Sequence, residues 1–223
     1  MRKEICLIKG AVNESYEDFS KRILFLGSAV SKEKYVEKIK VNFTKKAPPK
    51  VSIIPFRKDK IAAVSVYTSN NKSSNLPGKE QGFCGNYIVE EAVPVAYDKN
   101  WHDLKETPGE CLFTLFKQKR GIDYRTFIDR WHNGHTPLSL KIHPLWNYNR
   151  NVVNESTAEE DYKWDGIVEE QVRTASDLLN PFKFFGNPLI IIYRLILVFT
   201  DTKSFLDYKT IETYLNTEVW IKS

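Results

Sequence analysis

The chain has 223 residues, of which 42% are apolar and 27% are charged, with ten glycines and ten prolines. These proportions are ordinary for a globular protein and exclude a collagen, a coiled coil and a largely disordered chain. The longest apolar stretch, 189–199, contains Arg194 and is shorter than the roughly 20 residues that span a bilayer. The first residues show no secretory signal pattern, so we expect a cytoplasmic protein.

The net charge of +5 is concentrated in one segment. Residues 32–60 hold ten basic and three acidic side chains, and lysines alternate with apolar residues along 38–43. This alternation is typical of the solvated face of an edge strand, where lysines discourage pairing with another sheet. We therefore expect neither a nucleic acid nor a membrane as a partner. Binding of an anionic surface by residues 32–60 stays open as an alternative.

The three cysteines, Cys6, Cys84 and Cys111, lie among apolar, strand-like neighbours and form no C-x-x-C pair. Spacing of this kind is typical of reduced thiols in a core rather than of a disulfide framework or a zinc site.

An internal repeat appears when the chain is shifted by 108 positions. Five residues of the first copy are matched without a gap: Leu7, Lys9, Tyr16, Phe19 and Arg22 fall on Leu115, Lys117, Tyr124, Phe127 and Arg130. Both copies contain a strand-like run (5–9 and 111–117), a polar turn and an amphipathic helix that begins after Ser15 or Asp123, which are good N-cap residues. The aromatic side chains recur at helical spacing, so each helix should pack on a sheet.

The remaining elements follow in chain order. The first copy continues with strands at 37–43 and 61–67, a polar loop at 69–81 and a strand at 87–95. The second continues with strands at 145–153 and 164–172, a helix near Thr174 and a terminal strand at 218–221. The acidic segment 155–162 is expected as a loop, and 189–200 as one helix or strand. This order predicts an α+β fold of two tandem ferredoxin-like (β-α-β-β-α-β) repeats.

The predicted domains are a degenerate N-terminal ferredoxin-like repeat at 1–95, a connector at 96–109 and a C-terminal repeat at 110–223. The segment Phe127-Ile-Asp-Arg-Trp-His-Asn-Gly-His-Thr-Pro137 resembles the F-x-x-x-W-x-x-x-H-x-P motif of the EthD-domain family. The resemblance extends weakly over most of the chain and is closest to the long, two-copy members. It implies a dimeric α+β barrel, formed here by two sheets that pair face to face within one chain. The family is associated with ether degradation and with polyketide-type cyclase or dehydratase steps.

His135 is the first candidate catalytic residue. Asn133-Gly134 is expected to end one helix and Thr136-Pro137 to begin the next, which places His135 at a helix junction suited to an acid or base. A structural histidine that bonds a backbone carbonyl is the alternative. His132, His143 and His102 are expected as exposed or turn residues, and a metal site at His132 and His135 lacks acidic partners.

Further candidate residues surround this histidine in the predicted fold. Tyr124 or Arg150 would stabilise developing negative charge, and Asp165 would pair with Arg150 or His135. Trp146, Tyr148 and Arg150 share one face of a strand, so that the candidate ligand-binding residues are Trp131, Trp146, Tyr148 and Arg150. An ordinary aromatic core with Arg150 in a salt bridge is the alternative. The sequence contains no motif for a cofactor, and none is expected.

Two functions remain open from the sequence. The first is a cofactor-free acid–base enzyme, of cyclase, dehydratase or isomerase type, that acts on a small aromatic or polyketide-like molecule. The second is a non-catalytic barrel that binds a small hydrophobic molecule. A homodimer is compatible with either function.

Overall fold

The structure is a computed structural model that describes residues 1–69 and 80–223. Most of the loop predicted at 69–81 lies outside the described residues. The strands are β1 (Arg2–Lys9), β2 (Val36–Phe43), β3 (Ile61–Thr68), β4 (Phe83–Val95), β5 (Glu110–Phe116), β6 (Leu145–Ser156), β7 (Gly166–Val172) and β8 (Glu212–Lys222). The helices are α1 (Tyr16–Val30), α2 (Tyr124–Asp129), α3 (Thr136–Ile142), α4 (Ala175–Leu179), α5 (Pro181–Phe184) and α6 (Ile191–Phe205). A π-helical turn, Arg130–His135, joins α2 to α3, and a 3₁₀ turn covers Glu160–Tyr162.

The strands form one closed antiparallel barrel in the order β1-β3-β2-β8-β5-β7-β6-β4. The four strands before residue 96 are joined to the four after residue 109 by two backbone ladders, β2 with β8 and β4 with β6. The prediction of two ferredoxin-like repeats that form a dimeric α+β barrel is therefore wrong. Instead of two sheets packed face to face, the strand edges of the two halves hydrogen-bond to each other and close a single barrel.

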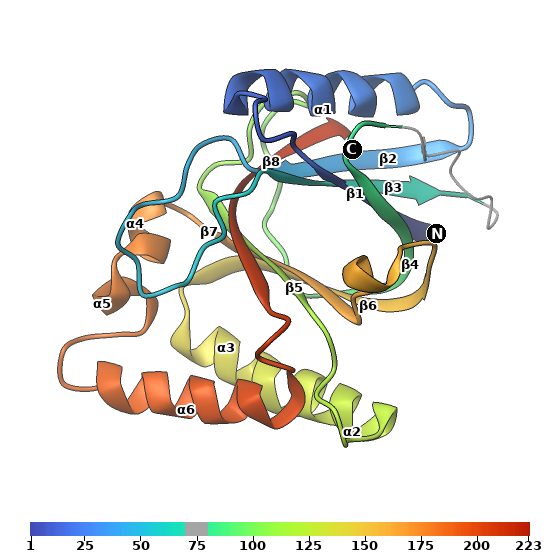
Figure 1. Cartoon of the computed structure of the whole chain (residues 1–223). Helices are drawn as coiled ribbons and strands as arrows, with labels where there is room; N and C mark the ends of the chain where they lie inside the picture. The colour runs from blue at the N-terminus through green and yellow to red at the C-terminus, as the bar shows by residue number, and fades with distance from the viewer. Residues whose placement is uncertain (70–79) are drawn as a thin grey trace.

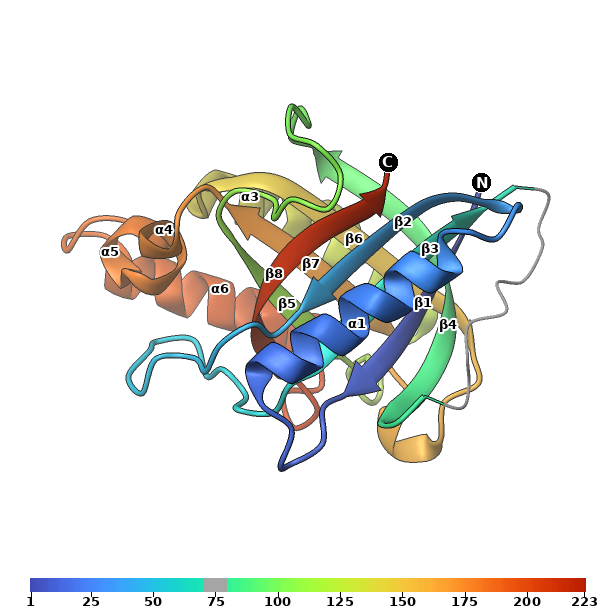
Figure 2. The same cartoon turned by 90° about the horizontal axis from the view of Figure 1, so that it is seen from above.

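Helices cover opposite sides of this barrel (Figures 1 and 2). Helix α1 packs across β2, β3 and β8, with Phe19, Ile23 and Leu26 in an apolar layer against the sheet. Helices α2, α3 and α6 lie on the other side, against strands of the second half. The largely apolar pocket that contains His135 lies in this second layer.

The side chains inside the barrel change from apolar to charged along its axis. One end is filled by an apolar cluster that includes Ile5, Leu7, Phe113, Leu115 and Tyr214. The other end contains buried ion pairs, in which Lys3 and Lys40 contact three carboxylates: Glu91, Glu169 and Glu218. Burial of each charge is offset by its partner of opposite sign and by amide hydrogen bonds.

Lys40 corrects the expectation of an edge strand with a solvated lysine face. The barrel has no edge at β2, because β3 and β8 pair with it on both sides. Lys40 points inward and is 1% exposed, in contact with Glu169 and 3.1 Å from Glu218. Alternation along the sequence predicted the strand correctly, but it could not show which face of the strand is solvated.

Other local expectations are confirmed. Ser15 and Asp123 accept backbone N–H bonds at the starts of α1 and α2, and Thr174 forms a capping box at α4. Cys6, Cys84 and Cys111 are buried free thiols. The ambiguous segment at 189–200 is helical from Ile191 onward, as part of α6.

None of the helices in the described residues has the length and apolar character needed to cross a bilayer.

Candidate functional site

A pocket of about 290 Å³ lies between the outer face of the second-half strands and the helices α3 and α6. Its walls are mostly apolar, formed by strand residues such as Leu112 and Val168 and by the helix residues Trp131 and Phe205. A few polar side chains interrupt these walls. The polar side chains that this structure places on the wall are Thr114, His135, Ser139, His143, Tyr148, Glu170, Thr202, Tyr208 and Thr213. Apolar walls with a few polar groups are the usual composition of a small-molecule site.

The π-helical turn positions His135 and Trp131 on the same side of the helix. The expected helix break at Asn133-Gly134 is wrong, because the backbone continues from α2 into α3 with one wide turn. The N–H of Thr136 bonds the carbonyl of Trp131 five residues back, and the Thr136 hydroxyl donates to the same carbonyl at 3.0 Å. Turns of this type widen a helix locally and are frequent at functional sites.

His135 is paired with Asp201 of α6, with 2.7 Å between Nδ1 and Oδ2. The two side chains are 13% and 20% exposed, so the pair is partly shielded from water. The carboxylate favours a proton on Nδ1, which leaves Nε2 as the basic atom of a neutral imidazole. The structure thus contains a carboxylate–histidine dyad at the wall of the pocket.

Glu170 is a second acid at this pocket. It is 8% exposed, and its Oε1 accepts a hydrogen bond from the Ser139 hydroxyl at 3.1 Å. Burial in apolar surroundings raises the pKa of this carboxyl, and the nearby His135 and Ser139 oppose the rise. A carboxyl with a raised pKa keeps its proton longer as pH rises, so it can donate a hydrogen bond or a proton to a bound molecule.

Two further polar side chains of the wall, His143 and Tyr148, are held in the neutral form. Burial lowers the pKa of His143 to about 4, and its Nδ1 lies 2.9 Å from the Phe184 carbonyl, so the neutral ring donates this hydrogen bond. The His143 ring also stacks on Phe184, with 4.0 Å between ring centroids. Burial likewise raises the pKa of Tyr148, which keeps its phenol protonated. Both side chains act as neutral parts of the wall.

The expected site residues are only partly brought together. His135, Trp131 and Tyr148 line this pocket, whereas Trp146 lines a different cleft. The reason is a register shift in the β6–β7 ladder between Leu145 and Asn147, which separates Trp146 from the regular alternation.

The other three expected residues lie outside the pocket wall. Tyr124 is 56% exposed at the start of α2. Asp165 accepts the backbone N–H of Gln118 at 2.7 Å rather than pairing with Arg150 or His135. Arg150 donates to the Thr136 hydroxyl at 2.6 Å, so it ties the π-helical turn to β6.

The sequence interpretation missed Asp201, Glu170 and Ser139. Asp201 lies in the segment 180–204, whose placement no local pattern defined. Glu170 carried a readable signal, since Glu169 and Glu170 are the adjacent charged residues of a short strand that begins and ends with apolar side chains. Alternation sends one carboxylate into the barrel and the other to the helix layer. Across residues 1–69 and 80–223, no cluster of His, Cys, Asp and Glu has the arrangement of a metal site.

Comparisons with known proteins support the fold. No protein-family model matches the chain, and no curated protein is significantly similar to it in sequence. Among solved structures, the chain is similar to one described as an anthrone oxidase-like protein, with a TM-score of 0.59 and 9% sequence identity. The alignment covers 98% of this chain and 90% of the other. At this identity the similarity shows a shared overall fold.

Proposed function

We propose that the chain is an EthD-like, cofactor-free acid–base enzyme that acts on a small aromatic or polyketide-like ketone in the pocket under α6. The observation that carries the proposal is the His135–Asp201 dyad on the wall of an apolar pocket that also contains the buried acid Glu170. A base and an acid in environments that favour opposite protonation states are the usual requirement for proton transfer at a carbon next to a carbonyl.

The proposed step is a proton transfer that moves a double bond. Nε2 of His135 removes a proton from a carbon that the substrate carbonyl makes acidic, either next to it or, as in the methylene group of anthrone, conjugated with it across a fused ring, and the electron pair of that C–H bond forms a C=C bond. The carbonyl oxygen gains negative charge, and the protonated Glu170 carboxyl donates its proton to it. Asp201 stabilises the imidazolium that forms. The enol O–H then returns its proton to Glu170 as the carbonyl re-forms, and the His135 imidazolium delivers its proton to a second carbon of the conjugated system, which completes an isomerisation and restores both residues.

The substrate class follows from the pocket. Its volume of about 290 Å³ is near the lower limit of ligand pockets, roughly 300–1,000 Å³, so a compact molecule is favoured. The aromatic side chains Phe116, Trp131 and Phe205 in the wall favour a flat, apolar ligand. The description of the structural neighbour as anthrone oxidase-like supports a fused-ring ketone as the first probe.

The test is hydrogen–deuterium exchange at the methylene group of anthrone in D₂O, followed by mass spectrometry with and without the protein. Wild type should accelerate exchange, and His135→Ala should lose about 10²- to 10⁴-fold of the acceleration, the usual contribution of a general base. Glu170→Gln should slow exchange while leaving anthrone affinity nearly unchanged. His102→Ala, an exposed histidine outside the pocket, is the matched control and should behave as wild type.

Affinity measurements separate the proposal from a non-catalytic binding barrel. If anthrone binds to wild type and to His135→Ala equally and neither accelerates exchange, the pocket is a binding site without this chemistry. If His135→Ala retains full acceleration, the assignment of His135 as the base is wrong. Thermal unfolding of each variant identifies any loss that comes from an unstable fold rather than from the missing group.

A further inference from the structure

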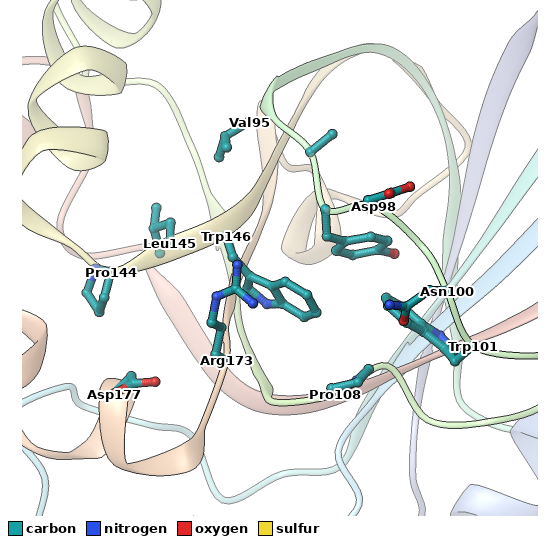
Figure 3. Close-up of a pocket in the computed structure, with 12 residues that line it drawn as sticks. Val95, Asp98, Asn100, Trp101, Pro108, Pro144, Leu145, Trp146, Arg173 and Asp177 are labelled. Atoms are coloured by element: carbon teal, nitrogen blue, oxygen red, sulfur yellow. The ribbon is translucent and has the colours of Figure 1, made fainter.

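A second, larger cleft lies away from the dyad, where the connector 96–109 passes beside the charged end of the barrel. It has a volume of about 900 Å³ and is bordered by the end of β4, the connector, the start of β6 and α4. Figure 3 shows Trp146 and Arg173 at its centre, with Trp101, Asn100 and Pro108 along one side and Pro144 and Asp177 along the other.

Three aromatic rings form one wall of this cleft. The ring centroids of Tyr97, Trp101 and Trp146 lie 5.0, 5.2 and 6.0 Å apart, so the rings pack on one another. The Tyr97 hydroxyl donates to Glu218 at 2.6 Å and accepts from the indole N–H of Trp220 at 2.5 Å. These bonds fix the wall to the charged end of the barrel, which makes it a rigid surface for a flat ligand.

Besides the hydrogen-bonded Tyr97 hydroxyl, this wall and its edge carry three donor groups that have no acceptor among the described residues. The exposed Arg173 guanidinium lies 4.8 Å from the centroid of the Trp146 ring, and in the described part of the chain it forms no ion pair and no hydrogen bond. The indole N–H groups of Trp101 and Trp146 are buried and likewise have no hydrogen-bond partner among the described residues. Because the two indole N–H groups are shielded from solvent, the exposed guanidinium is the group that a ligand can reach, and it favours an anionic ligand that supplies acceptor oxygens.

Two carboxylates at the rim, Asp177 and Asp98, affect how strongly the cleft favours an anionic ligand. Asp177 is already used, since it accepts the Thr174 N–H at 3.0 Å and lies 3.7 Å from Lys183. Asp98 is exposed on the rim and opposes an anion without neutralising Arg173 by a direct contact. The cleft therefore combines a wall of three aromatic rings, the Arg173 guanidinium without an ion-pair partner, and the Asp98 carboxylate at the rim, which weakly repels anions.

We propose that this cleft is a second binding site, specific for planar aromatic carboxylates, which stack on the Trp146–Tyr97–Trp101 wall and place their carboxylate on Arg173. The site is separate from the pocket of the His135–Asp201 dyad, and the proposal does not depend on the reaction proposed there. Arg173 provides the anion selectivity, and the three rings provide affinity for the flat body of the ligand.

The test uses 2-naphthoate as the anionic probe and 2-naphthamide as its neutral counterpart, each titrated by calorimetry. Arg173→Gln should weaken naphthoate binding about tenfold or more, the usual effect of losing a charge-assisted hydrogen bond, and naphthamide binding by less than about twofold. Asp98→Asn should strengthen naphthoate binding modestly. Arg125→Gln is the matched control. Arg125 is an exposed arginine on α2, outside the cleft, and its replacement should leave both affinities unchanged.

Three results would overturn the proposal. They are no naphthoate binding to wild type at millimolar concentration, equal naphthoate affinity in Arg173→Gln and wild type, or equal losses for both probes. His135→Ala separates the two pockets. If that variant loses naphthoate binding while Arg173→Gln retains it, the probe occupies the dyad pocket and the second site is refuted, whatever the outcome of the anthrone exchange experiment.

Discussion

At the scale of single residues, the dyad pocket depends on close packing behind its aromatic wall. The Phe116 and Trp131 rings meet edge to face, with 4.9 Å between centroids. Gly166, at the start of β7, lies directly under both rings. A Cβ at this position would come within 2.3 Å of Phe116 Cζ and 2.9 Å of Trp131 Cη2. The glycine is therefore required by space rather than by an unusual backbone conformation.

We predict that Gly166→Ala destabilises the protein by about 1–3 kcal/mol, the range measured for overpacked cores. The two rings must move for the methyl group to fit, so anthrone affinity should fall as well. Urea unfolding followed by tryptophan fluorescence measures the stability. Gly134→Ala is the matched control, because its Cβ would meet its nearest atom, Asp201 Oδ1, at 3.7 Å. Equal stability of Gly166→Ala and wild type would contradict the packing argument.

At the scale of elements, local signals predicted the starts of helices better than their interruptions. Ser15 and Asp123 cap helices because a short polar side chain reaches the free N–H groups of the first turn, an interaction confined to neighbouring residues. Asn133-Gly134 has the composition of a helix stop, yet the chain continues through it. The difference comes from Arg150 on β6, whose bond to Thr136 is a tertiary contact that no local pattern contains.

The π-helical turn should therefore depend on the Thr136 hydroxyl, which joins Arg150 to the Trp131 carbonyl. We predict that Thr136→Val, of nearly the same shape, costs about 1–3 kcal/mol, since the partly buried Arg150 guanidinium loses its 2.6 Å partner and the Trp131 carbonyl keeps only the backbone N–H of residue 136. Thr136→Ser keeps the hydroxyl and should recover most of this loss. Amide hydrogen exchange across 130–136 provides the local readout. Unchanged protection in Thr136→Val would show that the turn is held by packing alone.

At the scale of the whole molecule, the sequence predicted most strands but not how they close. The alternation of Lys40 and Asn42 with apolar residues identifies β2, and the acidic Glu169 and Glu218 lie far away in the sequence. Only closure of the barrel brings them together, because β2 pairs with β8 across the two halves. The charged interior is thus a property of the topology. The same holds for the dyad, since Asp201 reaches His135 only after α6 folds back over the second half.

The charged interior also predicts how stability depends on pH. Glu91 accepts hydrogen bonds from Lys3 at 2.7 Å and from Tyr67 at 2.8 Å. Burial alone would raise the pKa of Glu91, but the Lys3 charge and the hydrogen bonds outweigh it and lower the pKa to about 2. A carboxyl whose pKa is lower in the folded state stabilises the fold above its unfolded pKa, about 4.3. That stabilisation is lost as pH falls through the folded pKa.

We therefore expect the free energy of unfolding to fall steeply between about pH 4.5 and pH 2, with Glu91 contributing on the order of 3 kcal/mol and Glu169 adding to the same loss. Glu91→Gln should be less stable at pH 7, where Lys3 loses one partner, and its stability should decrease less on acidification. Urea titrations of both proteins at pH 7, 4.5 and 3 measure the two slopes. Glu90→Gln is the control. It removes the charge of the neighbouring residue, whose side chain is exposed, and should follow wild type. Parallel slopes for wild type and Glu91→Gln would mean that Glu91 is not a source of the acid sensitivity, and that the loss comes from other carboxylates of the barrel.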